Sequence, residues 1–130
     1  MEQENLAQTK VYTQNKTEAK TYAVESHTAL TVDWTDYTKP VENQGYCGSC
    51  WAFAGNTVLE GTEYLKKGGD RPYYSQQHPV DCSPDTSPYW NFGCNGGDSL
   101  RQYQWHVAEG VVTADEYPYT SGDSGNTGSC

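Results

Sequence analysis

The chain has 130 residues, 35% of them hydrophobic, and carries a formal net charge of −9. A chain of this length forms one modest domain, and its low apolar content favours extra covalent cross-links. Because nucleic acids and anionic membranes bind basic surfaces, the acidic charge argues against both as partners.

Residues 1 to about 30 are rich in Thr, Gln, Lys, Glu and Ala and contain few large apolar side chains. Such a composition does not offset the entropy of ordering the backbone, so we expect an extension or pro-region remnant that is flexible. No basic and apolar secretory signal and no segment long enough to span a membrane is visible. Together with the cysteine content, this suggests a processed or truncated product.

The composition changes at Leu30. Leu30, Val32 and Trp34 alternate with polar residues, which predicts a short strand, and Pro40 and Gly45 then interrupt the chain. We therefore place a domain at residues 31–130.

The longest predicted helix begins after Ser49, a suitable N-cap residue, and runs to about Lys67, where Gly68 and Gly69 end it. Its apolar residues recur with helical period and predict an apolar face. These residues are Trp51, Ala52, Phe53, Ala54, Val58, Leu59 and Leu65.

Two shorter helices follow. One starts near Ser75 and is limited to a turn or two by Pro79. The other spans Asp98 to Glu109, with apolar residues three and four positions apart, and ends at Gly110.

Cys50 is a candidate nucleophile because it follows a glycine turn at the start of the longest helix. Unpaired backbone N–H groups at a helix N-terminus carry partial positive charge and favour the reactive thiolate. Five cysteines allow two disulfides and leave one thiol, although the sequence does not choose between connectivities.

Two other uses of the cysteines deserve comparison. Cys47 and Cys50 have the spacing of a redox pair, but the surrounding chain lacks the βαβ pattern of thioredoxin-like proteins. A zinc site formed with Cys82 and Cys94 is disfavoured because this second pair lacks ligand spacing. We therefore expect neither a metal nor a cofactor.

From residue 31 to Cys130 the chain resembles the first half of a papain-like, cathepsin-type cysteine protease. The string Cys-Gly-Ser-Cys-Trp is a signature of these proteases. The landmarks, in order, are Asp33-Trp34, the block from Gln44 to Phe53, Glu60-Gly61, Val80-Asp81-Cys82-Ser83, Gly93-Cys94-Asn95-Gly96-Gly97, Tyr117-Pro118-Tyr119 and Cys130. The resemblance implies an α+β papain-like fold, of which this chain is the mostly helical left-hand domain without the β-rich right-hand domain.

The resemblance also implies roles for single residues. Cys50 is expected to attack a peptide carbonyl and form a thioester, and Gln44 to donate a side-chain hydrogen bond in the oxyanion hole beside the Cys50 N–H. The disulfides implied are Cys47 with Cys94 and Cys82 with Cys130.

The expected substrate is a peptide or protein that binds along a glycine wall. Gly48, Gly96, Gly97, Asp98 and Ser99 are the implied substrate-binding residues. Gly97 pairs main chain to main chain with an extended peptide. Asp98 and Ser99 occupy positions that in the family help to line an S2 pocket that is usually apolar, which argues against a preference for bulky hydrophobic side chains there.

The catalytic base is the element that this sequence lacks. In the family, the catalytic His and Asn lie about 130 to 150 residues beyond the cysteine, which is past the last residue here. His27, His78 and His106 do not match the catalytic His. We therefore expect a complementary chain or domain that carries His and Asn, and no activity from the 130 residues alone.

Two functions remain at this point. The chain is either the nucleophile-bearing half of a cysteine peptidase or a non-catalytic structural or peptide-binding subunit on the same scaffold. Retention of both Cys50 and Gln44 favours the peptidase. Disulfides in an acidic protein indicate an oxidising compartment, extracellular or lysosome-like.

Overall fold

The computed structural model describes residues 7–11, 20–24 and 32–130. The chain divides into two units, residues 1–33 and 34–130, each described here by itself. In the first unit, β1 (Ala7–Val11) pairs antiparallel with β2 (Lys20–Val24), so that Ala7 faces Val24. The sequence did not predict this hairpin, and the remainder of the expected extension lies outside the described residues.

The strand predicted around Leu30 to Trp34 is absent where the structure describes it. Residues 30 and 31 lie outside the described residues, and Val32 to Trp34 form no strand. Trp34 instead precedes the 3-10 helix η1 (Thr35–Tyr37), with its carbonyl accepting from the Tyr37 N–H at 2.9 Å. The Trp34 and Tyr37 rings also pack edge to face, with their centroids 5.6 Å apart. In a strand, side chains three residues apart point to opposite faces, so these two rings could not meet.

Helix α1 (Cys50–Lys67) has the predicted bounds. Gly68 ends it with a φ of 64°, a conformation that glycine adopts without steric cost. Ser49 stands at the N-cap position, but the prediction that its side chain caps the helix is wrong. Its hydroxyl is 2.7 Å from the Tyr119 hydroxyl instead.

The apolar residues of α1 divide between two sides. Trp51 and Ala52 are buried in the small core with Cys47 and Val80. In contrast, Ala54 is exposed, and Val58 and Leu65 are 60% and 49% exposed. The helix therefore packs on one side, and within residues 34–130 nothing covers its second apolar side.

Helix α2 (Gln77–Cys82) is short, as predicted, and Pro79 lies in its first turn, where a missing N–H costs little. The Ser75 hydroxyl accepts from the His78 N–H at 2.9 Å. Helix α3 (Ser99–Glu109) begins after Asp98 and ends at Gly110, also as predicted. The sequence did not predict α4 (Ser121–Ser124).

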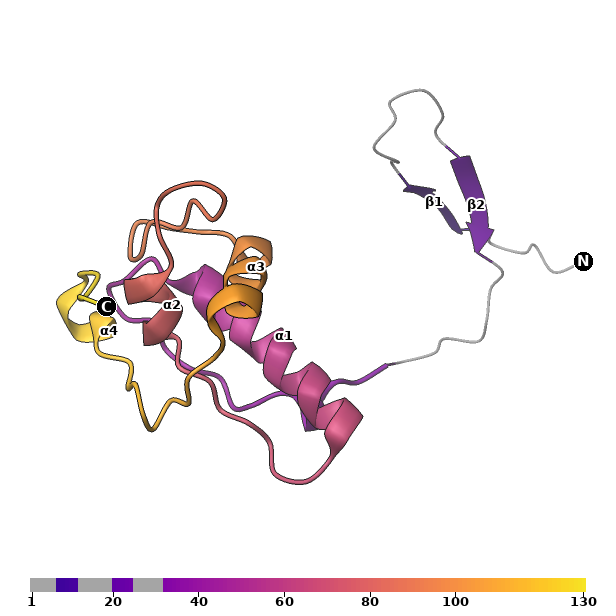
Figure 1. Cartoon of the computed structure of the whole chain (residues 1–130). Helices are drawn as coiled ribbons and strands as arrows, with labels where there is room; N and C mark the ends of the chain where they lie inside the picture. Colours follow the sequence, from indigo (N-terminus) through magenta and orange to yellow (C-terminus); the bar gives the residue numbers. More distant parts are fainter. Residues whose placement is uncertain (1–6, 12–19, 25–31) are drawn as a thin grey trace, which may run out of the picture. The chain divides into compact units, whose positions relative to one another are not determined.

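Helices α2, α3 and α4 lie toward the N-terminal half of α1 (Figure 1). Helix α3 packs along α1, and α2 also contacts α1. Helix α4 lies beside α2, where the Gln77 side chain accepts from the Ser121 N–H. No helix in the described part of the chain has the length and apolar character needed to cross a bilayer. The second unit is thus mostly helical, and the first turn of α1 lies among its other helices.

A buried ion pair fixes the segment that leads to the cysteine turn. The Lys39 ammonium lies 3.0 Å from the Glu60 carboxylate on α1 and 2.8 Å from Glu42. Burial raises the pKa of Glu60, while the Tyr74 N–H and Lys39 oppose that rise. Because breaking a buried pair leaves an uncompensated charge, this contact holds residues 39–42 against α1.

Candidate active site

Cys50 is the first residue of α1, and it is the one cysteine without a disulfide partner, with its side chain exposed. The Ser49 carbonyl accepts from the N–H groups of Ala52 and Phe53 at 2.9 and 3.2 Å, which starts the helix at this point. The thiol therefore lies at the positive end of an 18-residue helix, accessible to a reagent or substrate.

Gln44 begins the turn before the nucleophile. Its side-chain amide donates to the Cys47 carbonyl at 2.9 Å, which uses one of its two N–H groups. Gly45 has a φ of 63°, and an added Cβ there would lie 2.3 Å from the Gly122 carbonyl oxygen. The Tyr46 N–H donates to the same oxygen at 2.8 Å. Glycine is required here because the turn packs directly against the backbone of α4, to which Gly122 belongs.

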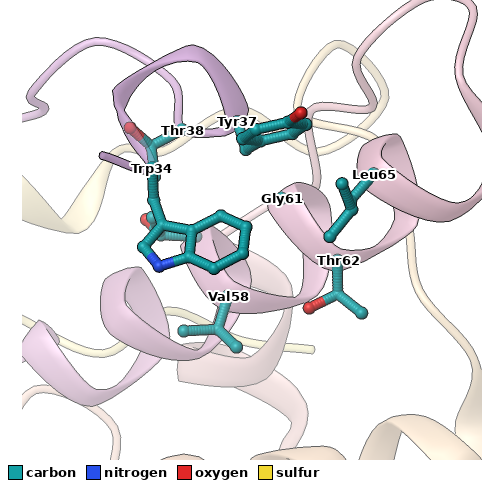
Figure 2. A pocket seen from close by; sticks show the side chains of 8 residues that line it. Trp34, Tyr37, Thr38, Val58, Gly61, Thr62 and Leu65 are labelled. Atoms are coloured by element: carbon teal, nitrogen blue, oxygen red, sulfur yellow. The ribbon is translucent and has the colours of Figure 1, made fainter. Parts of the chain in front are cut away.

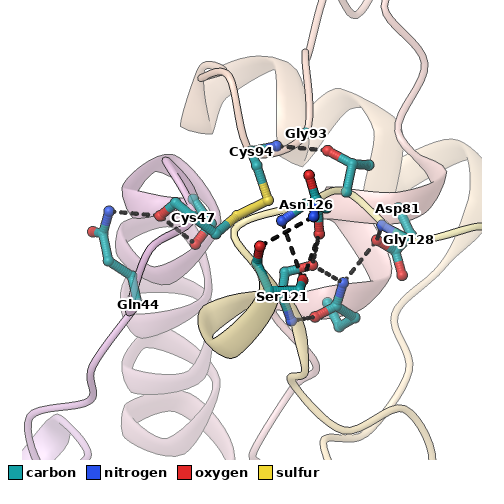
Figure 3. The surroundings of a disulfide bond; sticks show 12 residues. Gln44, Cys47, Asp81, Gly93, Cys94, Ser121, Asn126 and Gly128 are labelled. Atoms are coloured by element: carbon teal, nitrogen blue, oxygen red, sulfur yellow. Dashed lines mark hydrogen bonds between the residues drawn. A yellow bond between two sulfur atoms is a disulfide. The ribbon is translucent and has the colours of Figure 1, made fainter.

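A disulfide joins this turn to the glycine-rich segment (Figure 3). Cys47 is bonded to Cys94, and the Gly48 N–H donates to the Cys94 carbonyl at 2.9 Å. A Cβ on Gly48 would lie 2.4 Å from that oxygen, so the close approach needs glycine. Gly48 also forms an isolated parallel bridge with Asn95. The pair is the one that the resemblance implies, and a redox pair of Cys47 with Cys50 is absent.

The second disulfide, Cys82 with Cys130, ties the last residue to the end of α2. The Asp81 carboxylate beside it accepts from the Gly128 N–H at 2.7 Å and from the Tyr117 hydroxyl at 3.1 Å. Both disulfides use cysteines of the disfavoured zinc site. Within the described ranges, no cluster of three His, Cys, Asp or Glu residues could hold a metal.

Gly96 and Gly97 continue from the disulfide toward α3. Gly96 has a φ of 113°. A Cβ on Gly97 would come within 2.6 Å of the Trp51 indole, so Gly97 lies directly against the residue that follows Cys50. This places the glycine segment beside the start of α1.

Asp98 and Ser99 have structural contacts in this site. The Asp98 carboxylate caps α3 by accepting from the N–H groups of Leu100 and Arg101 at 2.8 and 3.1 Å. The Ser99 hydroxyl donates to the Trp51 carbonyl at 2.8 Å. The Asp98 side chain remains exposed, whereas Ser99 is half-buried. Their expected part in substrate selection stays a prediction.

Neither of the two histidines that the structure describes, His78 and His106, lines the cleft that contains the thiol. That cleft is bordered by Gln44, Cys50, Phe53 and Thr57 together with the segment from Thr38 to Glu42. His27 lies outside the described residues.

His78 and His106 instead belong to α2 and α3. The ring of His78 packs on Trp105 at 4.8 Å, and burial lowers the pKa of His78, with the Asp81 charge opposing. Burial likewise lowers the pKa of His106.

Comparison with known proteins gives the family. The sequence profile described as "Papain family cysteine protease" matches residues 28–130, and the chain belongs to that family. It is 39% identical to Cathepsin L 1 of Paramecium tetraurelia over 95% of this chain and 40% of that protein. It is 43% identical to human Cathepsin L2 over 71% of this chain and 27% of that protein.

Solved structures agree. A cysteine protease of Carica candamarcensis, in complex with E-64, superimposes with a TM-score of 0.60 and 33% identity over 68% of this chain and 40% of that one. Recombinant stem bromelain precursor superimposes with a TM-score of 0.63 and 32% sequence identity, over 76% of this chain and 30% of that one. The expected mostly helical left-hand domain is thereby confirmed. The chain spans less than half the length of these relatives.

Proposed function

We propose that this chain is the nucleophile-bearing half of a cysteine peptidase that hydrolyses peptide bonds through a thioester, with His and Asn supplied by a second segment. The observation that carries the proposal is the single free thiol at the start of α1, in a turn cross-linked to a glycine segment. A structural subunit has no physical need for an exposed thiol in this place.

The chemistry follows from the site. The imidazole of the second segment takes the proton of the Cys50 thiol. The thiolate attacks the substrate carbonyl carbon, and the C=O electron pair moves to the oxygen. The second N–H of the Gln44 amide and the Cys50 backbone N–H stabilise that oxyanion. Collapse expels the amine, which takes a proton from the imidazole of the second segment. Water then attacks the thioester and releases the acid and the thiol.

The peptide lies along Gly96 and Gly97, where no Cβ obstructs a main-chain pairing. The Asp98 carboxylate is exposed at the end of this wall, so side chains selected there are expected to be polar or basic rather than bulky and apolar. Gly48, next to the disulfide-bonded Cys47, borders the peptide on the side of the cysteine turn.

The uncovered side of α1 supports a second domain. Figure 2 shows an apolar groove bordered by Trp34, Tyr37, Val58 and Leu65. Thr38 and Thr57 line both this groove and the Cys50 cleft, and Val41 in the Cys50 cleft is 102% exposed. Contiguous exposed apolar surface of this kind marks an interface. A domain that covered it would also border the Cys50 cleft, which is where His and Asn must act.

The compartment follows from the disulfides. Two disulfides in a chain of 130 residues fit an oxidising environment, extracellular or lysosome-like. This assignment belongs to the proposal.

Acyl transfer from p-nitrophenyl acetate tests the function on the chain itself. This ester has a leaving group that needs no proton, so the folded chain is expected to release an equimolar burst of p-nitrophenolate in mildly alkaline buffer. Deacylation then stays slow. Added imidazole supplies the missing base and should accelerate deacylation in proportion to its concentration.

The controls separate the alternatives. Cys50→Ala should abolish the burst, and it should leave no acetyl group on the chain whose loss imidazole could accelerate once excess ester is removed. The wild-type chain alone should not cleave peptides. A correctly folded chain with one titratable thiol and no burst would favour the non-catalytic subunit. Peptide cleavage that vanished in Cys50→Ala but survived each single histidine substitution would show that no imidazole is needed.

A further inference from the structure

Tyr119 contacts both segments that carry the proposed oxyanion donors. Its hydroxyl lies 2.7 Å from the backbone carbonyl oxygen of Gln44 and 2.7 Å from the Ser49 hydroxyl. Gln44 carries the side-chain donor, and Ser49 immediately precedes Cys50. One phenol from a segment about seventy residues away thus bridges the two.

The direction of these hydrogen bonds is fixed by chemistry. A carbonyl oxygen only accepts, so the single Tyr119 proton goes to Gln44. The Ser49 hydroxyl then donates to Tyr119 at 2.7 Å in preference to the Cys47 carbonyl, its other acceptor, at 3.5 Å. Burial raises the pKa of Tyr119, and the hydrogen bond with Ser49 opposes the rise. The chain of donors therefore runs from Ser49 through Tyr119 to Gln44.

The phenol is held from other directions as well. Its ring packs edge to face on Phe53, with centroids 4.9 Å apart and planes at 86°. The following residues are anchored by Gln77, whose buried side-chain carbonyl accepts from the N–H groups of Thr120 and Ser121 at 2.8 and 2.9 Å. The backbone around Tyr119 is consequently fixed without its hydroxyl.

We propose that Tyr119 is a positioning residue, whose hydroxyl keeps the Gln44 amide in register with the Cys50 backbone N–H so that both donors reach one oxyanion. This inference rests on the proposed function. It assigns a role to Tyr119 of the Tyr117-Pro118-Tyr119 landmark, whose resemblance to the family implies no chemistry for that residue.

The test compares two reactions of the same thiol. p-Nitrophenyl acetate acylates Cys50 through a tetrahedral oxyanion: the C–S bond forms, the carbonyl electrons move to oxygen, and p-nitrophenolate leaves. Iodoacetamide alkylates Cys50 by direct displacement of iodide without an oxyanion. The ratio of the acylation rate to the alkylation rate therefore reports the oxyanion donors and cancels changes in thiol exposure or ionisation.

Tyr119→Phe removes the hydroxyl and keeps the ring on Phe53. We expect the ratio to fall about tenfold, because small misplacements of catalytic groups are costly, while alkylation stays within about twofold. Tyr117→Phe is the matched control. It also loses a half-buried hydroxyl with two partners, Asp81 and Ser129, and it should leave the ratio unchanged.

Gln44→Ala and Ser49→Ala complete the design. Gln44→Ala should lower the ratio more than Tyr119→Phe, since it removes a donor outright. Ser49→Ala combined with Tyr119→Phe should lower it no further than Tyr119→Phe alone, because the two act in one chain. Circular dichroism and a count of free thiols establish folding for each variant.

The outcomes distinguish this inference from the function on which it rests. If Gln44→Ala lowers the ratio and Tyr119→Phe does not, or if Tyr117→Phe lowers it equally, Tyr119 has no positioning role and the proposed function stands. If Gln44→Ala leaves the ratio unchanged, the oxyanion assignment fails, and the role of Tyr119 fails with it.

Discussion

His106 gives the sharpest prediction because it ends a chain of buried polar groups. Its Nδ1 lies 3.0 Å from the Gly110 carbonyl, which only accepts, so Nδ1 carries the proton. Its Nε2 then accepts from the Gln102 side-chain amide at 3.1 Å. The same amide donates to Asn56 at 2.8 Å, and Asn56 donates to the Tyr74 carbonyl at 3.1 Å. This order of donors requires a neutral imidazole.

Protonation of His106 would place an N–H against the amide N–H of Gln102. Burial lowers the pKa of His106, the Gly110 carbonyl opposes that shift, and the nearby His78 adds to it. Below about pH 6.5 the unfolded chain binds a proton that the folded chain resists, so stability from the neutral ring is present above that pH and is lost as the pH falls. The slope is at most about 1.4 kcal/mol per pH unit.

The assay is urea unfolding at several values between about pH 7.5 and pH 5.5, for the wild-type chain and His106→Gln. Contributions of carboxylates and of His78 are largely common to both chains, so the difference isolates His106. We expect the wild-type stability to fall more steeply on acidification, by about 1 kcal/mol per pH unit. Parallel pH dependences would refute the assignment of a neutral ring in this network.

Two further predictions concern what holds the domain together. Replacing both Cys47 and Cys94 by Ser should lower the free energy of unfolding by about 4 kcal/mol, because the disulfide closes a loop with a sequence separation of 47 residues. A loss below about 1 kcal/mol, measured by chemical denaturation, would contradict the cross-link. Val80→Ala, at a side chain 1% exposed, should cost about 2 kcal/mol, whereas Val58→Ala on the uncovered side should change stability by less than about 0.5 kcal/mol. Equal melting temperatures for the two valine variants would show that the core is misplaced.

Local chemistry explains which elements the sequence predicted. Helix α1 ends at Gly68 and α3 begins after Asp98 and ends at Gly110, because caps and positive φ angles are encoded within a few residues. Helix α4 depends instead on the Gln77 side chain, 44 residues before Ser121, and no local pattern announces that contact.

The site shows the same division. Cys50 was predicted from its place before a helix, and the roles of the other site residues came from the resemblance. The preference of serine for helix N-caps predicts a side-chain cap at Ser49, but its hydroxyl bonds to Tyr119 instead. Nothing in residue spacing indicates that Tyr119 reaches Gln44, because the two lie 75 residues apart and meet only in the folded chain.

The most direct measurement of the central claim is the ratio of acylation to alkylation at Cys50 in the folded chain and in the same chain unfolded in urea with its disulfides intact. If the fold arranges oxyanion donors around this thiol, the ratio should be at least about tenfold higher in the folded chain, with the acyl group mapped to the Cys50 peptide. An equal ratio in the two states, or acyl groups found on other residues, would contradict the account.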